Sequence, residues 1–258
     1  MDIKMIAIDL DRTLLRTDKT ISVYLADVLM RCRERGIKVV FATARPKRTV
    51  MGFCKIISTD ALILHNGAVT YIADDLMNSY SIAQKPRDYI LQALSRDYPE
   101  ATLSVEIDDT LYANFDVCTV WNYTQAVMTD FTDLPDMPAD KIIVGVSSMD
   151  DVDQFSKYIP GELYIEMSDG KLGLIMNRNA TKWNALCSVA MHFGISAAEI
   201  VSFGDDYNDI DMLRKCGIGV AMANAINEVK AVSDYICDTN DNDGVAKWLE
   251  ENVFSSID

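Results

Sequence analysis

The stretch Met5-Ile-Ala-Ile-Asp-Leu-Asp-Arg-Thr13 decides the fold of this chain. Its first half is an unbroken apolar run, which predicts a strand buried on both faces of a parallel sheet. The run stops at two carboxylates spaced by one residue, Asp9 and Asp11. Open α/β folds bind their ligands at the carboxyl edge of the sheet, and a strand that ends in two acids brings charge to that edge. Asp9 and Asp11 are therefore the first candidate functional residues.

Two further apolar runs predict strands that end at the same edge. Residues 37–42 form a β-branched run that ends at Thr43, and residues 23–35 carry apolar positions at helical spacing between the two strands. A strand, a helix and a strand of these lengths form a right-handed parallel unit. Residues 61–64 predict a third strand, followed by a tight turn at Gly67. We therefore expect an α/β fold with a Rossmann-like parallel sheet.

The pattern changes after residue 83, where strands and helices no longer alternate in the same order. Three prolines, at positions 135, 138 and 160, separate the segments of this region. We expect an inserted α+β domain over residues 84–176, which leaves 1–83 and 177–258 for the core. The elements expected in the insertion are helices over 86–98 and 115–129, two strands within 102–113, and strands over 141–147 and 163–167.

The chain then returns to the pattern of its first part. Thr181 is placed to cap a helix over residues 181–193, and Gly194 is placed to end it. A short strand over 200–203 runs into Gly-Asp-Asp-Tyr-Asn-Asp at residues 204–209, so a strand again ends in carboxylates. The elements expected to complete the core are strands over 217–222 and 235–237 and a helix over 245–252.

Charge and cysteine content argue against several classes of function. The chain has 24 Lys and Arg against 39 Asp and Glu, a net charge of −15, which disfavours nucleic acid and anionic membranes as partners. Its six cysteines are scattered without a Cys-x-x-Cys pair, so we expect neither a zinc site nor a disulfide framework. No apolar run has the length of a signal peptide or a membrane span. We therefore expect a soluble cytoplasmic protein that acts on small molecules without an obligate protein partner.

The acids at the strand ends have the chemistry of a magnesium-dependent site for phosphoryl transfer. Asp9, Asp11 and Asp205 supply hard oxygen ligands for Mg²⁺, and a cation is needed to offset their mutual repulsion. One carboxylate can attack a phosphoryl group while its neighbour moves protons, an arrangement that Asp9 and Asp11 could form. The Thr43 hydroxyl and Lys182, at a helix start, are suited to hold phosphoryl oxygens. Lys182 alone would more often be a solvated residue at a helix end.

Four separated segments together resemble the haloacid dehalogenase superfamily of phosphatases, specifically its Cof-type subclass. The first is Asp9-Leu-Asp-Arg-Thr13, which matches the pattern Asp-x-Asp-x-Thr, and the second, over residues 41–45, places Thr43 at a strand end. The third is the helix-borne Lys182, and the fourth is Gly-Asp-Asp-Tyr-Asn-Asp over residues 204–209. The insertion lies between the second and third motifs, where this subclass carries an α+β cap that sets substrate specificity.

The resemblance implies a role for each residue of the predicted site. Asp9 attacks the phosphoryl group to form an aspartyl-phosphate, and Asp11 protonates the leaving alcohol and then activates water. Mg²⁺ lies between Asp9, the Asp11 carbonyl and Asp205. Four residues bind the phosphoryl oxygens: Thr43, Ala44, Lys182 and Asn208. Asp209 supports the loop of the fourth motif or an outer water of the metal.

Three residues depart from the usual pattern of the superfamily, and none of them removes a reacting group. Arg12 and Ala44 stand where the family usually has glycine, and Trp183 follows the lysine at a position where glycine is common. Arg12 could narrow the backbone freedom of the loop after the first strand, and Trp183 could shape substrate access.

The sequence thus predicts a Mg²⁺-dependent phosphomonoesterase that hydrolyses small phosphorylated metabolites, with sugar phosphates as the foremost class. A phosphomutase of the same superfamily is the first alternative, because it shares the two-step chemistry but keeps and reorients its intermediate. A catalytically silent binding module that keeps the fold is the second alternative. It is disfavoured because every reacting group is present.

Overall fold

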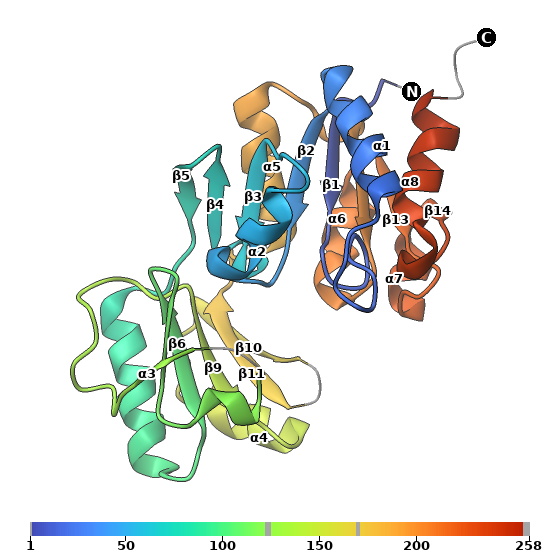
Figure 1. Ribbon diagram of the computed structural model, residues 1–258. Helices are drawn as coiled ribbons and strands as arrows, with labels where there is room; N and C mark the ends of the chain where they lie inside the picture. The colour runs from blue at the N-terminus through green and yellow to red at the C-terminus, as the bar shows by residue number, and fades with distance from the viewer. Residues whose placement is uncertain (1, 122–124, 169–170, 255–258) are drawn as a thin grey trace. The chain divides into compact units, whose positions relative to one another are not determined.

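The computed structural model describes residues 2–121, 125–168 and 171–254, and the chain forms two compact units (Figure 1). The first unit comprises Met1–Ser79 and Thr181–Asp258, and the second comprises Tyr80–Ala180. The second unit is therefore slightly wider at both ends than the predicted insertion over 84–176. Among the described residues, no helix combines the length and the apolar character needed to cross a membrane.

The first unit is built on one large sheet. Its strands from β14 to β3 run parallel, whereas β4 and β5 form an antiparallel hairpin that the sequence did not predict. The predicted α/β fold with a parallel core sheet is confirmed. The eight strands lie in the order β14 (Tyr235–Ile236), β13 (Ile218–Ala221), β12 (Ile200–Gly204), β1 (Met5–Ile8), β2 (Lys38–Ala42), β3 (Ala61–Leu64), β4 (Val69–Ile72) and β5 (Asp75–Ser79).

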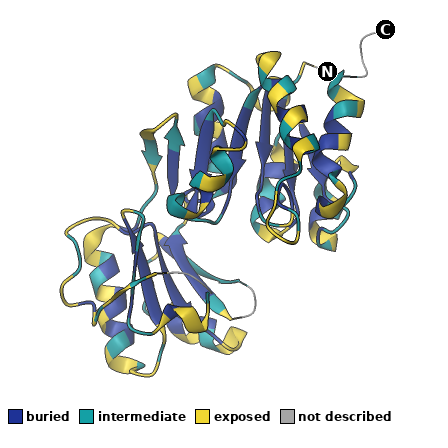
Figure 2. Cartoon of the chain, in the orientation of Figure 1, coloured by how far each residue is buried: buried dark blue, intermediate teal, exposed yellow. Residues whose placement is uncertain are grey.

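Strand β1 pairs with a strand on each side and is buried on both faces. Ile6 and Ile8 pack in one apolar cluster, and Met5 and Ala7 pack in another. All four side chains are fully buried, and Figure 2 shows the same burial for the neighbouring strands. Ile8 is the last residue of β1, so Asp9 follows a backbone that is paired on both sides.

Helices cover both faces of this sheet. One cluster packs beneath α1 (Val23–Glu34) and α8 (Gly244–Leu249), and the other packs beneath α5 (Lys182–Phe193) and α6 (Ile210–Lys215). The remaining segments of the unit are α2 (Lys47–Cys54), α7 (Asn227–Val232), the π-helical turn η6 (Glu250–Phe254), and the short 3₁₀ turns η1 (His65–Gly67), η3 (Ala197–Glu199), η4 (Tyr207–Asp209) and η5 (Asn240–Asn242).

Helix α5 begins and ends where the sequence predicts. The Thr181 side chain accepts a hydrogen bond from the N–H of Asn184 at 3.1 Å, which caps the first turn. Gly194 ends the helix with a φ of 67°, a left-handed conformation that glycine adopts without steric cost. These two signals fix the first turn of α5, and with it Lys182, relative to the sheet.

The second unit is an α+β sandwich of one sheet and two helices, α3 (Gln84–Asp97) and α4 (Met149–Ser156). Its strands pair antiparallel, except that β7 and β8 run parallel. Helices and strands meet in one apolar cluster that includes Ile90, Val105 and Phe155. The six strands lie in the order β10 (Leu163–Ser168), β11 (Leu172–Asn177), β9 (Lys141–Gly145), β6 (Leu103–Ile107), β7 (Thr110–Ala113) and β8 (Val127–Met128).

The prediction of a helix over residues 115–129 is wrong for the part of that range that the structure describes. Residues 122–124 lie outside the described residues. The Asp116 side chain accepts a hydrogen bond from the N–H of Cys118, which starts the short 3₁₀ turn η2 (Val117–Thr119) instead of a helix. Phe115, Val117 and Trp121 pack with Leu111 and Ala113 in a small separate cluster. Local packing around β7 therefore outweighs the helical spacing of the apolar residues.

Replacing Gly67 by alanine is expected to destabilise the first unit more than the same change at Gly36. Both glycines have a positive φ, 102° and 82°, which costs an alanine about 1 kcal/mol. A Cβ at Gly67 would also lie 2.3 Å from the Thr181 carbonyl oxygen, whereas nothing lies within 4 Å of a Cβ at Gly36. Urea unfolding should show a loss of about 3 kcal/mol for Gly67→Ala and about 1 kcal/mol for Gly36→Ala. Equal losses would contradict the close contact between Gly67 and Thr181.

Candidate active site

Three of the predicted site residues follow neighbouring parallel strands and meet at one edge of the core sheet. Asp9 follows β1, Thr43 follows β2, and Asp205 follows β12. The N–H of Asp9 donates to the Phe203 carbonyl at 3.1 Å, and the N–H of Thr43 donates to the Ile63 carbonyl at 2.8 Å. The backbone pairing of the sheet thus continues to the site residues themselves, which fixes where their side chains begin.

Lys182 connects two of the predicted residues inside the protein. Its ammonium donates to Asp9 Oδ1 at 2.6 Å and to Asp209 Oδ1 at 2.7 Å, and its side chain is fully buried. Burial alone would lower the pKa of Lys182, but the charges of Asp209 and Asp9 raise it overall. Lys182 therefore stays charged, and the contact is a buried ion pair with two carboxylates.

Asp209 holds the loop of the fourth motif. Its second oxygen, Oδ2, accepts hydrogen bonds from the N–H groups of Asp205 and Asp206 at 3.0 and 3.2 Å. The loop passes so close to this side chain that a Cβ at Gly204 would lie 2.5 Å from Asp209. Both carboxylate oxygens of Asp209 are thus used by the protein, one by Lys182 and one by the loop.

Asp205 is held by the loop that follows β1. Its Oδ1 accepts a hydrogen bond from the Thr13 hydroxyl at 2.9 Å, and its Oδ2 lies 3.6 Å from the Nε of Arg12. Burial, with the charge of Asp209, raises the pKa of Asp205 to about 6. The first and fourth motifs are therefore joined through this carboxylate.

Asp9, Asp205 and Asp209 could hold a metal ion, since one carboxylate oxygen from each lies within 4.8 Å of the others. Carboxylate oxygens are the ligands that hard divalent cations prefer. Burial raises the pKa of Asp9 well above its ordinary value, and the nearby Asp209 and Asp205 add to the rise that Lys182 opposes. A cation would relieve this excess of buried negative charge. Because both oxygens of Asp209 are engaged, Asp9 and Asp205 are the better ligands.

The structure does not bring the Asp11 side chain into this cluster. Its carboxylate accepts two hydrogen bonds from Arg45, at 2.6 and 2.7 Å, and one from Lys19 at 2.7 Å. Burial alone would raise the pKa of Asp11, but these hydrogen bonds lower it to about 2. Asp11 is therefore an ionised carboxylate in this conformation. The roles of Arg45 and Lys19 were missed from the sequence, where only their positive charge in the motif loops could have pointed to them.

The other predicted phosphate ligands line the same edge. Thr43 is buried, and its hydroxyl accepts a hydrogen bond from the N–H of Arg45 at 3.2 Å. The Asn208 side chain donates to Asn66 Oδ1 at 2.9 Å. Asn66 was not among the predicted site residues, although the turn that carries it follows β3 at this edge. Ala44 lies between Thr43 and Arg45 in the loop after β2.

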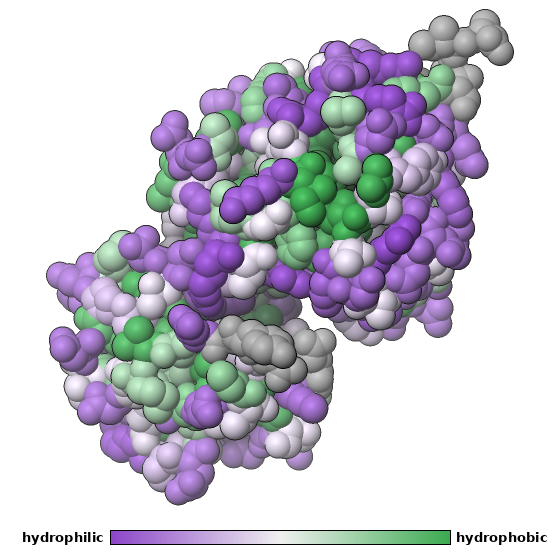
Figure 3. Space-filling model, in the orientation of Figure 1, coloured by the Kyte–Doolittle hydropathy of each residue, from purple (hydrophilic) through white to green (hydrophobic). Residues whose placement is uncertain are grey.

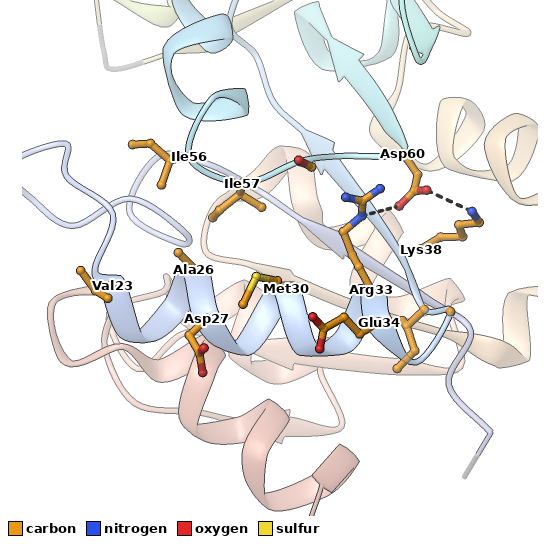
Figure 4. A pocket seen from close by; sticks show the side chains of 13 residues that line it. Val23, Ala26, Asp27, Met30, Arg33, Glu34, Lys38, Ile56, Ile57 and Asp60 are labelled. Atoms are coloured by element: carbon orange, nitrogen blue, oxygen red, sulfur yellow. Dashed lines mark hydrogen bonds and ion pairs between the residues drawn. The ribbon is translucent and has the colours of Figure 1, made fainter.

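Figure 4 shows a pocket of about 620 Å³ at a different place in the first unit. Its polar wall contains Asp60, which binds Arg33 and Lys38 at 3.2 and 3.0 Å. Lys38 begins β2 and Asp60 precedes β3, so the pocket reaches the amino ends of these strands, opposite the carboxylate cluster. Met30 and Ile56 line the pocket and are exposed, and Figure 3 shows a hydrophobic area on the surface of the first unit. The pocket is therefore separate from the candidate active site.

Removing the Lys182 charge is expected to destabilise the protein. Lys182→Met would leave Asp9 and Asp209 buried without their shared partner, at a cost of about 3 kcal/mol. The matched change Lys215→Met removes an exposed lysine that pairs with Asp211, which should cost less than about 1 kcal/mol. Urea unfolding of both variants at neutral pH, with EDTA present, measures the difference. Similar losses in the two variants would contradict the buried contact.

Comparison with known proteins places these motifs in a family. The sequence model of the family described as haloacid dehalogenase-like hydrolase matches residues 6–249. A putative phosphatase of Haemophilus influenzae is 28% identical over 96% of this chain and 97% of its own length. A 5-amino-6-(5-phospho-D-ribitylamino)uracil phosphatase of Bacillus subtilis is also 28% identical, over 96% of both chains.

Solved structures show the same fold. A protein of Thermotoga maritima superposes with a TM-score of 0.87 and 26% identity, over 99% of this chain and 98% of that one. A sugar phosphatase of haloacid dehalogenase subclass IIB superposes with a TM-score of 0.84 and 23% identity, over 98% of this chain and all of that one. The similarity therefore spans both units of the chain.

Proposed function

The chain belongs to the haloacid dehalogenase-like hydrolases and is a phosphatase of that family, and we propose that it hydrolyses sugar phosphates through an aspartyl-phosphate on Asp9. The single observation that carries the proposal is the buried contact of Lys182 with both Asp9 and Asp209, with Asp205 beside them. The contact leaves Asp9 Oδ2 without a hydrogen bond from the described residues. This oxygen is the nucleophile of the proposed reaction.

Asp9 attacks the phosphorus of a bound phosphate ester, and the alcohol leaves from the opposite side. Lys182 keeps its hydrogen bond to Asp9 Oδ1, so the attacking carboxylate is held in one orientation. Thr43, the backbone at Ala44, Lys182 and Asn208 bind the phosphoryl oxygens, whose negative charge is stabilised by such donors. Water then attacks the aspartyl-phosphate, and inorganic phosphate is released.

Asp9, Asp205 and the carbonyl of Asp11 would hold Mg²⁺ in this proposal, as oxygen ligands from two neighbouring strand ends. When bound, the ion supplies positive charge that offsets the phosphoryl oxygens and the two carboxylates. Asp209 remains outside this ligand set, because its oxygens already accept hydrogen bonds from Lys182 and the loop. Its proposed role is to support the loop that presents Asp205.

Asp11 is the proposed acid and base. It gives a proton to the leaving oxygen in the first step and takes one from water in the second. With a pKa of about 2, Asp11 holds too few protons at neutral pH while Arg45 and Lys19 bind it. Proton donation therefore requires that Asp11 leaves these two cations when substrate binds.

One observation supports sugar phosphates as the substrate class. The Bacillus subtilis relative is named for a uracil derivative that carries a phosphorylated ribityl chain, so the phosphate of that substrate is held by a sugar alcohol chain. In the proposal, the insertion over 84–176 selects the leaving group, as the caps of this subclass do.

Asp9→Asn is expected to abolish phosphate release. The amide cannot act as the nucleophile, so release from a panel of sugar phosphates, nucleotides and phosphorylated cofactors should fall by about a thousandfold or more. The matched control Asp211→Asn removes an exposed carboxylate on α6 and should leave activity within about twofold. EDTA should stop the native enzyme, and added Mg²⁺ should restore it.

Activity of Asp9→Asn comparable to that of Asp211→Asn would overturn the nucleophile assignment. Rapid hydrolysis of nucleotides with slow hydrolysis of sugar phosphates would overturn the substrate class. A phosphate ester that is isomerised instead of hydrolysed would identify a phosphomutase.

Asp11→Asn is expected to separate the two steps. p-Nitrophenyl phosphate has a leaving group that departs without a proton, so this variant should release about one equivalent of p-nitrophenol per active site and then slow. An alkyl phosphate, whose leaving group needs the proton, should give no such burst. Stopped-flow absorbance of p-nitrophenol for the aryl ester and a quenched-flow assay of the released alcohol for the alkyl ester measure the two cases. Equal slowing of both esters, without a burst, would contradict the acid and base role of Asp11.

A further inference from the structure

Arg12 has a backbone conformation that is unusual for its residue type. Its φ is 61°, in the left-handed region that glycine and asparagine adopt more readily than a long side chain. Two hydrogen bonds with one residue hold it there: Arg12 Nη2 donates to the Asn224 carbonyl at 3.1 Å, and Asn224 Nδ2 donates to the Arg12 carbonyl at 2.8 Å. The arginine is therefore fixed at both its backbone and its side chain.

Asn224 is itself fixed by a third loop. Its Oδ1 accepts a hydrogen bond from the N–H of Asn240 at 3.0 Å. The Asn240 side chain in turn donates to the Leu15 carbonyl at 2.9 Å, three residues after Arg12. The loops that follow β1, β13 and β14 thus form a closed ring of hydrogen bonds, which sets the position of the Arg12 guanidinium from outside the carboxylate cluster.

This ring places a positive charge against one of the proposed metal ligands. Arg12 Nε lies 3.6 Å from Asp205 Oδ2, while the Thr13 hydroxyl occupies Oδ1. Lys182 pairs with Asp9 and Asp209, but no hydrogen bond or ion pair joins it to Asp205. Any cation that Asp205 binds would therefore share this carboxylate with the guanidinium of Arg12.

We propose that Arg12 is a positioning residue that weakens the binding of Mg²⁺ by the Asp9 and Asp205 carboxylates, so that the site requires a higher metal concentration than the same carboxylates would without it. This inference rests on the metal site of the proposed function. A guanidinium and a doubly charged cation beside the same carboxylate repel each other enough, at the effective dielectric of a half-exposed site, to change an affinity by about tenfold or more. The side chain of Arg12 is 58% exposed, so salt screens the repulsion.

The test is isothermal titration calorimetry of Mg²⁺, without substrate, into the native protein and the variants Arg12→Asn and Arg12→Gly. Asparagine and glycine both adopt a φ of 61° readily, and both remove the charge. If one variant fails to fold, the other still tests the inference. We expect the Kd for Mg²⁺ to fall about tenfold in both variants at 50 mM salt. At 1 M salt, the ratio of the native Kd to the variant Kd should approach one.

The matched control is Arg16→Asn, which removes the same charge from the same loop. Arg16 donates a hydrogen bond to Asp243 at 2.7 Å and does not bind the carboxylate cluster. The Kd of the Arg16→Asn variant for Mg²⁺ should therefore stay within about twofold of the native value. Mg²⁺ binding that is unchanged or weaker in both Arg12 variants overturns the inference about Arg12 and leaves the proposed function standing. If neither the native protein nor any Arg12 variant binds Mg²⁺ at millimolar concentration, the metal site of the proposed function fails, and the inference fails with it.

Discussion

The site depends on one interaction, the buried ion pair of the Lys182 ammonium with the carboxylates of Asp9 and Asp209. Three charged groups without solvent around them are tolerated only when each has close partners. Those partners come from the end of β1, the first turn of α5 and the turn after β12, which are far apart in the sequence. The Thr181 cap and the close approach of Gly67 to Thr181 fix the helix start that this geometry needs.

The same buried charges explain why the surrounding loops are so tightly bound to one another. Lys182 offsets only part of the negative charge of Asp9, Asp205 and Asp209. The Thr13 hydroxyl donates a hydrogen bond to Asp205, and backbone N–H groups of the fourth motif donate to Asp209. Such bonds orient the carboxylates but do not neutralise them, which is why a cation belongs in the proposed reaction.

The sequence predicted the core of the first unit well because its signals are local. The run from Met5 to Ile8 and the cap at Thr181 depend on neighbours in the chain, and both elements formed as expected. The helix over 115–129 failed because contacts with β7 decide that segment. Helix α4 was missed although Ser148 and Asp151 form a capping box that the sequence displays.

The site was less predictable than the fold, since its pairings join side chains from separate loops. Asp9 and Asp11 lie two residues apart, yet their environments differ: burial raises the pKa of Asp9, and Arg45 and Lys19 lower that of Asp11. No pattern in the sequence could reveal that Arg45, from the second motif, binds Asp11 of the first. The contrast between the two acids nevertheless agrees with a division of roles, because residues in different environments can perform different steps of one reaction. In the proposed reaction, release of Asp11 from its two cations costs free energy, which substrate binding would provide before the leaving group is protonated.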